Sequence, residues 1–278
     1  MIVTRSVHEK ALERLVVELD ERGLHESAGI HGPGSAMWKM NAGLDNFLGA
    51  GRAILLQLAH PYVAYAIADH SSTVSDVRRR FQATFENVYG MTFGSRADAL
   101  AKARIVHAVH ARIHGALPTA IGRFEAGHRY HANDSDALLW VHATLIGTAL
   151  HVQRLTHHEP GEAEREELYE SSKRFALLFG LDHALVPSTL RDFDTYTEQM
   201  IAGDTLCVSP PAREMANFIF EAPKRNLRPA FAIYRALTAS LLPPRLARGY
   251  GMACGSKERA IAGLLLRGAG AGLPLLPP

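Results

Sequence analysis

Hydrophobic residues recur at spacings of three and four along almost the whole chain, which is the pattern of amphipathic α-helices. Strand-like alternation is nearly absent, and no repeat of 20–50 residues or Ser/Gly linker divides the sequence. The pattern predicts one all-α domain, a helical bundle of about ten helices over residues 1–278. The predicted helices cover residues 4–22, 52–69, 76–90, 96–116, 135–157, 162–179, 188–202, 210–221, 226–240 and 256–267.

Several helix boundaries carry capping signals. The predicted N-caps are Asp76, Ser95, Ser135 and Ser188, and the predicted helix stops are Gly23 and Gly180. Pro61 inside the helix 52–69 removes a backbone donor and predicts a kink, where His60 would cap the disrupted turn. The Gly- and Pro-rich tail 268–278 is predicted to form no regular element.

Composition narrows the class of protein. Hydrophobic residues make up 47% and charged residues 21%, which is typical of a globular protein rather than a disordered one. A net charge of +2 argues against a nucleic-acid-binding protein. The uncharged stretches Ala53–Ala68 and Ala137–Gln153 fall short of the ~20 apolar residues of a membrane span, so no integral membrane segment is predicted. Two cysteines, Cys207 and Cys254, exclude a disulfide framework and a Cys-rich zinc site and suit a reducing cytoplasm.

Histidine is the candidate chemistry of this chain, since nine of its 15 histidines lie between His107 and His158. His107, His110 and His114 fall on one predicted helix, within about 60° of arc at 3.6 residues per turn. The surrounding residues are mostly alanines, so a planar cofactor could approach closely and one imidazole could reach its metal. The alternative is one core histidine with two solvated ones. The HExxH arrangement of zinc proteases is missing.

Two further positions invite a cofactor hypothesis. His142 is surrounded by apolar residues, and a buried imidazole must find a hydrogen-bond partner or a ligand. Arg80 and Thr84 are neighbours at i, i+4, and a guanidinium among aromatic residues suits a buried carboxylate or a cofactor propionate. The alternative for His142 is a core histidine whose hydrogen bonds are satisfied. The alternative for Arg80 is a solvated charged turn over residues 78–80.

Five blocks and a C-terminal segment together resemble the family of latex-clearing protein (rubber oxygenase) and the mycophenolic-acid pathway oxygenase MpaB, over roughly residues 35–255. The blocks are Leu55–Pro61 (LLQLAHP), Arg80–Thr84 (RFQAT), Phe93–Ser95 (FGS), His110–Gly115 (HARIHG) and Leu138–Thr144 (LLWVHAT), and the segment is Leu241–Pro244 with Tyr250 and Gly251. Their order and spacing carry the resemblance rather than any single block.

The resemblance implies an all-α fold, globin-like only in general character, that holds haem b between helices. The family's proximal iron ligand matches His110, and a second family histidine near the haem matches His142. The family's Arg and Thr match Arg80 and Thr84. The distal lysine of rubber oxygenases is replaced by Ala83, and their proposed acidic base has no counterpart in the uncharged Ala64–Ala68. Both departures argue against rubber cleavage itself.

The sequence therefore predicts a haem-b-dependent oxygenase that uses O₂ on a hydrophobic small molecule, with oxidative C=C cleavage as one option. His110 is the predicted metal ligand, and His107 and His60 are predicted to contact the cofactor. Arg80 is predicted as a propionate clamp or distal donor, Thr84 as a distal polar contact and His142 as a supporting catalytic residue. A haem-binding sensor or carrier and a His-liganded metal hydrolase are the alternatives. Substrate and oligomeric state stay open.

Overall fold

The computed structural model describes residues 2–43, 46–70, 74–156, 161–252 and 254–271. Within these ranges, residues 2–7, 46, 74–78, 80 and 81 are described by their backbone alone. It is 71% helical, with thirteen α-helices and one two-stranded sheet, so the predicted all-α class is confirmed. The helices are α1 (Ile2–Glu21), α2 (Ala36–Ala42), α3 (Asn46–Leu58), α4 (Pro61–Ala68), α5 (Val74–Phe93), α6 (Arg96–His110), α7 (Ser135–Thr156), α8 (Glu162–Leu178), α9 (Leu190–Ala202), α10 (Pro210–Ile219), α11 (Arg228–Leu241), α12 (Pro244–Gly249) and α13 (Ser256–Gly270). The strands are β1 (His114–Ala116) and β2 (Arg129–His131), and short 3₁₀ turns are η1 (Glu26–Ala28), η2 (His183–Leu185) and η3 (Arg225–Leu227).

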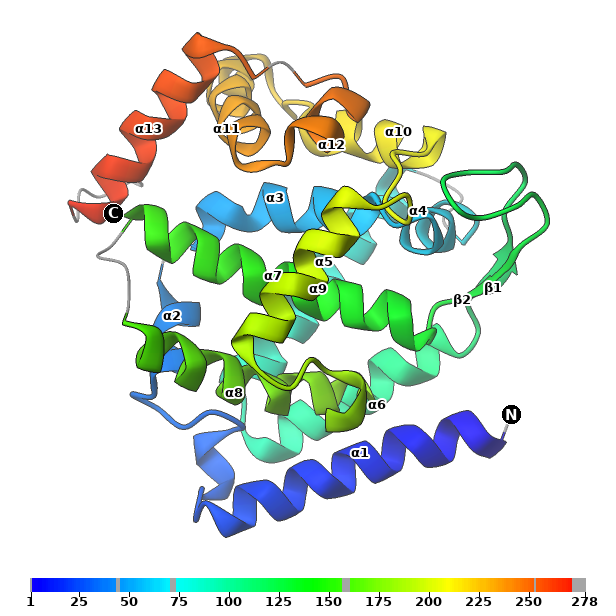
Figure 1. Cartoon of the computed structure of the whole chain (residues 1–278), viewed down its shortest axis with the longest axis vertical. Coiled ribbons are helices and arrows are strands. Elements are labelled where there is room, and N and C mark those ends of the chain that lie inside the picture. Colours follow the sequence, from blue (N-terminus) through cyan, green and yellow to red (C-terminus); the bar gives the residue numbers. More distant parts are fainter. Residues whose placement is uncertain (1, 44–45, 71–73, 157–160, 253, 272–278) are drawn as a thin grey trace.

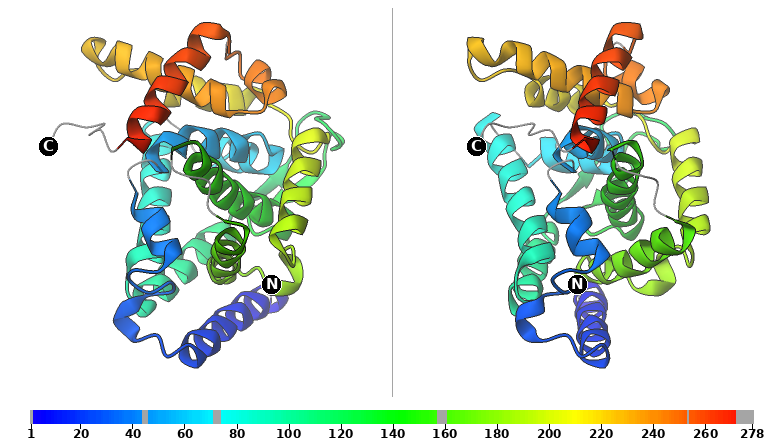
Figure 2. Two further views of the ribbon diagram at one scale, coloured as in Figure 1. Left: turned by 60° about the vertical axis from the view of Figure 1, so that its left-hand side comes forward. Right: turned by 90° about the vertical axis from the view of Figure 1, so that its left-hand side faces the viewer.

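The long helix α7 crosses the middle of the molecule (Figure 1). It is buried on several faces, as expected of a helix whose apolar residues run around its circumference. Helix α3 packs on one side of it and α8 on the other (Figures 1 and 2). Helices α10–α12 form a layer beyond α3, α13 packs on both α11 and α7, and α1 and α6 lie beyond α8. No helix in the described ranges has the length and apolar character needed to cross a membrane.

Two glycines let α3 approach its neighbours closely. A Cβ atom at Gly49 would lie 2.6 Å from Thr148 of α7, and one at Gly51 would collide with Thr238 of α11. Beside them, the buried Arg52 donates from Nε to Leu241 O (3.0 Å) and from Nη1 to Thr148 Oγ1 (2.6 Å). The three helices are therefore held together by both a small-residue contact and an arginine.

The predicted helix 52–69 is two helices, α3 and α4, which meet at Pro61. His60 is the N-cap of α4, and its Nδ1 accepts a hydrogen bond from Tyr62 N at 3.3 Å. The kink and the capping role are therefore confirmed. The same packing buries His60, and burial lowers its pKa to about 4.

The other boundaries follow the capping signals within a few residues. Ser95 caps α6 with a full capping box, and Gly23 and Gly180 adopt positive φ where α1 and α8 end. The expected caps Ser135 and Ser188 are each one residue off, since Asp134 and Thr189 accept the capping hydrogen bonds. The short helices α2 and α12 were not predicted. Helix α13 continues to residue 270, so the irregular tail begins later than expected; residues 272–278 lie outside the described ranges.

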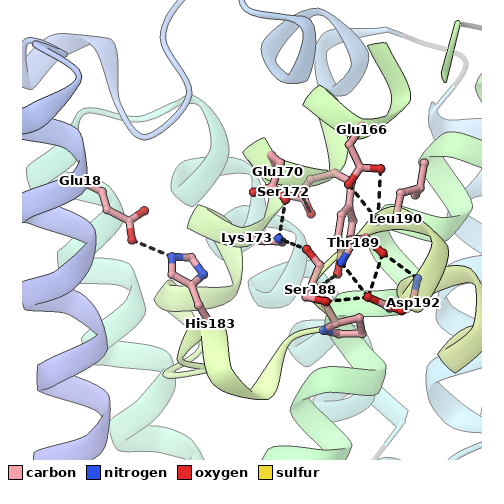
Figure 3. Close-up of polar contacts among 12 residues, drawn as sticks. Glu18, Glu166, Glu170, Ser172, Lys173, His183, Ser188, Thr189, Leu190 and Asp192 are labelled. Carbon is pink, nitrogen blue, oxygen red and sulfur yellow. Dashed lines mark hydrogen bonds and ion pairs between the residues drawn. The ribbon is translucent and has the colours of Figure 1, made fainter. Parts of the chain in front are cut away.

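Polar contacts tie the segment before α9 to α8 and to α1 (Figure 3). Thr189 and Asp192 form a capping box at the start of α9, and Glu166 of α8 accepts from Leu190 N at 3.1 Å. Lys173 donates to Ser188 O at 2.6 Å. Next to them, His183 Nε2 lies 2.6 Å from Glu18 Oε1. These contacts hold the start of α9 against α8, and η2 against α1.

Replacing Thr189 with alanine is expected to lower the free energy of unfolding by about 1 kcal/mol, because Asp192 N loses its acceptor at the first turn of α9. Urea denaturation measures the change. Thr189→Ser keeps the hydroxyl and is the matched control, expected within about 0.5 kcal/mol of the parent. Equal losses in both variants would show that the methyl group, and not the cap, stabilises this corner.

Candidate functional site

The last turn of α6 presents His107 and His110, and the helix ends there. Arg112 N bonds to Val109 O (3.1 Å) and Ile113 N to His110 O (3.0 Å), so the last turn tightens and α6 stops. The prediction that His114 continues the same helix face is wrong. His114 is the first residue of β1, is exposed, and pairs with His131 of β2.

The hairpin explains why the helix stops short. Ile113 is buried, and Ala132 N donates to its carbonyl oxygen at 2.9 Å. A Cβ atom at Gly115 would lie 2.5 Å from the Tyr130 hydroxyl, so only glycine lets the strand pass over this ring. The tyrosine in turn donates to Asp69 Oδ2 at 2.6 Å. Strand pairing and burial of this hairpin therefore outweigh the helical preference of residues 111–116.

A small cavity of about 10 Å³, room for about one water molecule, lies beside the end of α6. It brings together two of the predicted site residues, His107 and His110, both half-buried. Its lining is otherwise mostly apolar. The complete lining is His8, Ala103, Val106, His107, His110, Asn133, Leu138, Leu178 and Phe179, from α1, α6, α7, α8 and the turn after β2.

His8 of α1 lies against this cavity and was missed by the sequence analysis. Its ring stacks on that of His107, with centroids 3.9 Å apart and planes at 11°, and its Nε2 lies 3.3 Å from Leu178 O. Burial lowers the pKa of His8 to about 4 and lowers the pKa of His107 as well. The sequence held a signal, because His8 continues the apolar stripe of Leu12, Leu15 and Leu19 by one turn.

Asn133 fixes the other side of the His107 turn. Its Nδ2 donates to His107 O at 3.2 Å, and its backbone N donates to His131 Nδ1 at 3.0 Å. The residue was also missed, since a single asparagine between a strand and a helix carries no distinctive pattern. The end of α6 is therefore held by α1 on one side and by the hairpin on the other.

His142 lies one helical turn behind the cavity. On α7, His142 follows the lining residue Leu138 by four positions, which is about one turn. Its ring centroid lies 6.5 Å from that of Phe175 on α8, and Phe175 precedes the lining residue Phe179 by four positions. His142 is 0% exposed, and neither ring nitrogen has a hydrogen-bond partner among the described residues. Burial lowers its pKa to about 4, so the ring is neutral at pH 7.

The remaining predicted site residues are not brought to the cavity. His60 caps α4, as described above, and does not line it. Thr84 lies on an exposed part of α5. The Arg80 side chain is outside the described part of the structure. Their predicted roles toward a cofactor stay predictions.

The resemblance implies haem b, and the residues at the cavity have the chemistry that this cofactor requires. The size of the cavity does not match it. An imidazole at the cavity edge is a haem ligand by type, and two unpartnered nitrogens on a buried ring favour a bound group nearby. The cavity, at about 10 Å³, is nevertheless far smaller than the ~300–1,000 Å³ of ligand pockets. In the part of the chain that the structure describes, no three His, Cys, Asp or Glu side chains are grouped to hold a bare metal ion.

Comparison with known proteins adds the class of activity. The family described as "ER-bound oxygenase mpaB/B'/Rubber oxygenase, catalytic domain" matches residues 38–273, which run from within α2 through α13 and leave α1 outside. The matched residues extend further toward the C-terminus than residues 35–255, over which the sequence blocks resemble the family. No curated protein and no solved structure is similar enough to the chain to add to this assignment. The chain belongs to the family of mpaB/B' and rubber oxygenase catalytic domains.

Proposed function

We propose that this chain is a haem-b-dependent oxygenase that uses O₂ on a hydrophobic small molecule. Membership of an oxygenase family supports the reaction class. The observation that carries the cofactor is the neighbourhood of His110: a cavity with an imidazole at its edge and, one helical turn behind it, the buried and unpartnered His142. A cytoplasmic location belongs to the same proposal, since Cys207 and Cys254 are free thiols.

His110 would hold the haem iron through one ring nitrogen, and the haem would supply the binding and activation of O₂. His107 would be kept in orientation by the ring of His8 and by Asn133 on its carbonyl oxygen. His142, neutral at pH 7, has one donor and one acceptor to offer a group that enters beside it. Arg80 and Thr84 keep the propionate and distal roles that the resemblance implies.

The cavity has to widen for this function. Leu138 and Phe179 line it on the side of His142, and each lies one turn from a residue of the His142–Phe175 ring contact. Movement of these two side chains would extend the cavity toward His142. Helix α1 bounds the cavity through His8 and precedes the matched family domain, so this wall is supplied by the chain's N-terminal helix.

The lining also supports the substrate class. Ala103, Val106, Leu138, Leu178 and Phe179 give the cavity an apolar wall, which favours an alkyl or unsaturated hydrocarbon chain over a charged metabolite. Among the described residues, no carboxylate lines it.

Oxygen consumption tests the proposal. Haem-supplemented protein is mixed with a panel of unsaturated lipids and isoprenoids under ¹⁸O₂, and the products are analysed by mass spectrometry. We expect ¹⁸O in a product, with oxygen uptake that depends on substrate. Haem binding without uptake across the panel would favour the sensor or carrier alternative, and uptake that does not require haem would overturn the cofactor.

A further inference from the structure

The charge of the chain is unevenly distributed, which the small net charge conceals. Residues 222–257 contain seven lysines and arginines and no aspartate or glutamate. Since the whole chain carries only +2, the remaining residues are net negative. This basic stretch includes η3, α11 and α12, which lie in the layer farthest from α1 (Figure 1).

Some of these bases stabilise the fold. Arg245 donates to carbonyl oxygens at the end of α9 and beyond, Ile201 O at 2.7 Å and Gly203 O at 2.9 Å, and Arg235 donates to Gly251 O at 3.2 Å. Carbonyls at a helix C-terminus are favourable partners for a cation. These two side chains are therefore accounted for by structure.

Three of the other five bases gather on a projecting segment that we name the α11 tip, residues 223–233; Arg248 and Lys257 lie outside it. Every residue from 223 to 230 is exposed, and Figure 2 shows the start of α11, in gold, at an edge of the molecule. The tip carries Lys224, Arg225 and Arg228. Within the described ranges, none of the three forms an ion pair.

Apolar side chains are exposed between and beside these bases. Leu227 is 37% exposed and Ile233 is 42% exposed, and Phe231 between them is partly exposed. The projecting start of α11 therefore exposes three cations and three apolar side chains within ten residues, from 224 to 233. The buried part of α11 begins only later, at Leu237, so the tip is not needed to complete the core.

We propose that the α11 tip docks this protein onto an anionic phospholipid bilayer. Lysine and arginine next to an anionic leaflet each strengthen binding about five-fold, and exposed apolar side chains insert at the headgroup boundary. The mixture favours a bilayer over a nucleic acid, because phosphate contacts alone would not use Leu227 and Ile233. The proposal does not depend on haem or on oxygenase activity.

Sedimentation with vesicles tests it, using the full chain and no substrate. Vesicles of 30% phosphatidylserine in phosphatidylcholine are compared with pure phosphatidylcholine at low and physiological salt. Lys224→Gln/Arg225→Gln/Arg228→Gln is expected to weaken binding to the anionic vesicles by about 100-fold. Leu227→Ser/Ile233→Ser is expected to keep the electrostatic binding to anionic vesicles at low salt. The same variant is expected to lose binding at physiological salt, where the charges are screened.

The matched control neutralises three exposed bases elsewhere, Lys10→Gln/Arg22→Gln/Arg191→Gln, and is expected to bind as the parent does. Circular dichroism and thermal midpoints confirm that every variant is folded. Equal weakening in both triple variants would overturn the assignment to the α11 tip. No preference of the parent for anionic vesicles, or tighter binding to single-stranded DNA at the same salt, would overturn the bilayer as partner.

Discussion

Replacing His110 with alanine is expected to weaken haem retention by about 100-fold or more. Loss of a residue that only supports a metal ligand costs 10–100-fold in affinity, and loss of the ligand itself costs at least as much. The variant should remain folded, because His110 is the last residue of α6 and only half-buried. Haem titration followed by absorbance, with a competing apo-globin, measures the affinity.

His114→Ala is the matched control for this experiment. The residue lies four positions further along the same motif, yet it is exposed in β1 and outside the cavity lining. We expect His114→Ala to bind haem as tightly as the parent. Loss of haem in His114→Ala with retention in His110→Ala would overturn the ligand assignment, and loss in both would point to the hairpin as a whole.

The free energy of unfolding is expected to fall by about 4 kcal/mol per pH unit as pH drops from 6.5 toward 4.5. Burial lowers the pKa of His60 and His142 to about 4 and of His31 to about 3, against the ordinary value of 6.5. The pKa values of His8 and His151 are lowered to about 4 too, and these less deeply buried rings contribute less. In this window the unfolded chain therefore binds about three more protons than the folded one, and each changes the free energy of unfolding by about 1.4 kcal/mol per pH unit. The stabilisation is complete above pH 6.5.

Urea unfolding at half-unit pH steps measures this slope. His142→Leu removes one of these titrating groups and is expected to reduce the slope by about 1 kcal/mol per pH unit. At pH 8 it should be at least as stable as the parent, because two unpartnered buried nitrogens are removed. His25→Gln, at an exposed position, is the control and should leave the slope unchanged. A parent whose stability is flat between pH 6.5 and 4.5 would contradict the neutral, buried histidines.

Local signals were enough to predict most of the fold. The apolar stripe of residues 12, 15 and 19 marks α1, the capping box at Ser95 marks the start of α6, and Pro61 marks the break after α3. Each depends on residues that are neighbours along one helix. Short helices such as α12 lack the length for a periodic pattern, so they escape this kind of prediction.

Only half of the site could be predicted, because it depends on contacts between residues that are distant in the sequence. His107 and His110 share a helix turn and were correctly paired, whereas His114 is drawn into the hairpin by Tyr130 and Ala132, which lie distant in sequence. His8 reaches His107 only because α1 packs across α6 and α8. Contacts between helices are set by packing of the whole core, and periodicity along one helix carries no information about them.

The absorption spectrum of the purified, haem-supplemented protein, oxidised and reduced, is the most direct test of a haem centre at His110. The account predicts a Soret band after removal of free haem, with about one haem per chain and a spectrum that changes on reduction and on addition of CO. A folded protein that retains no porphyrin under these conditions would contradict it.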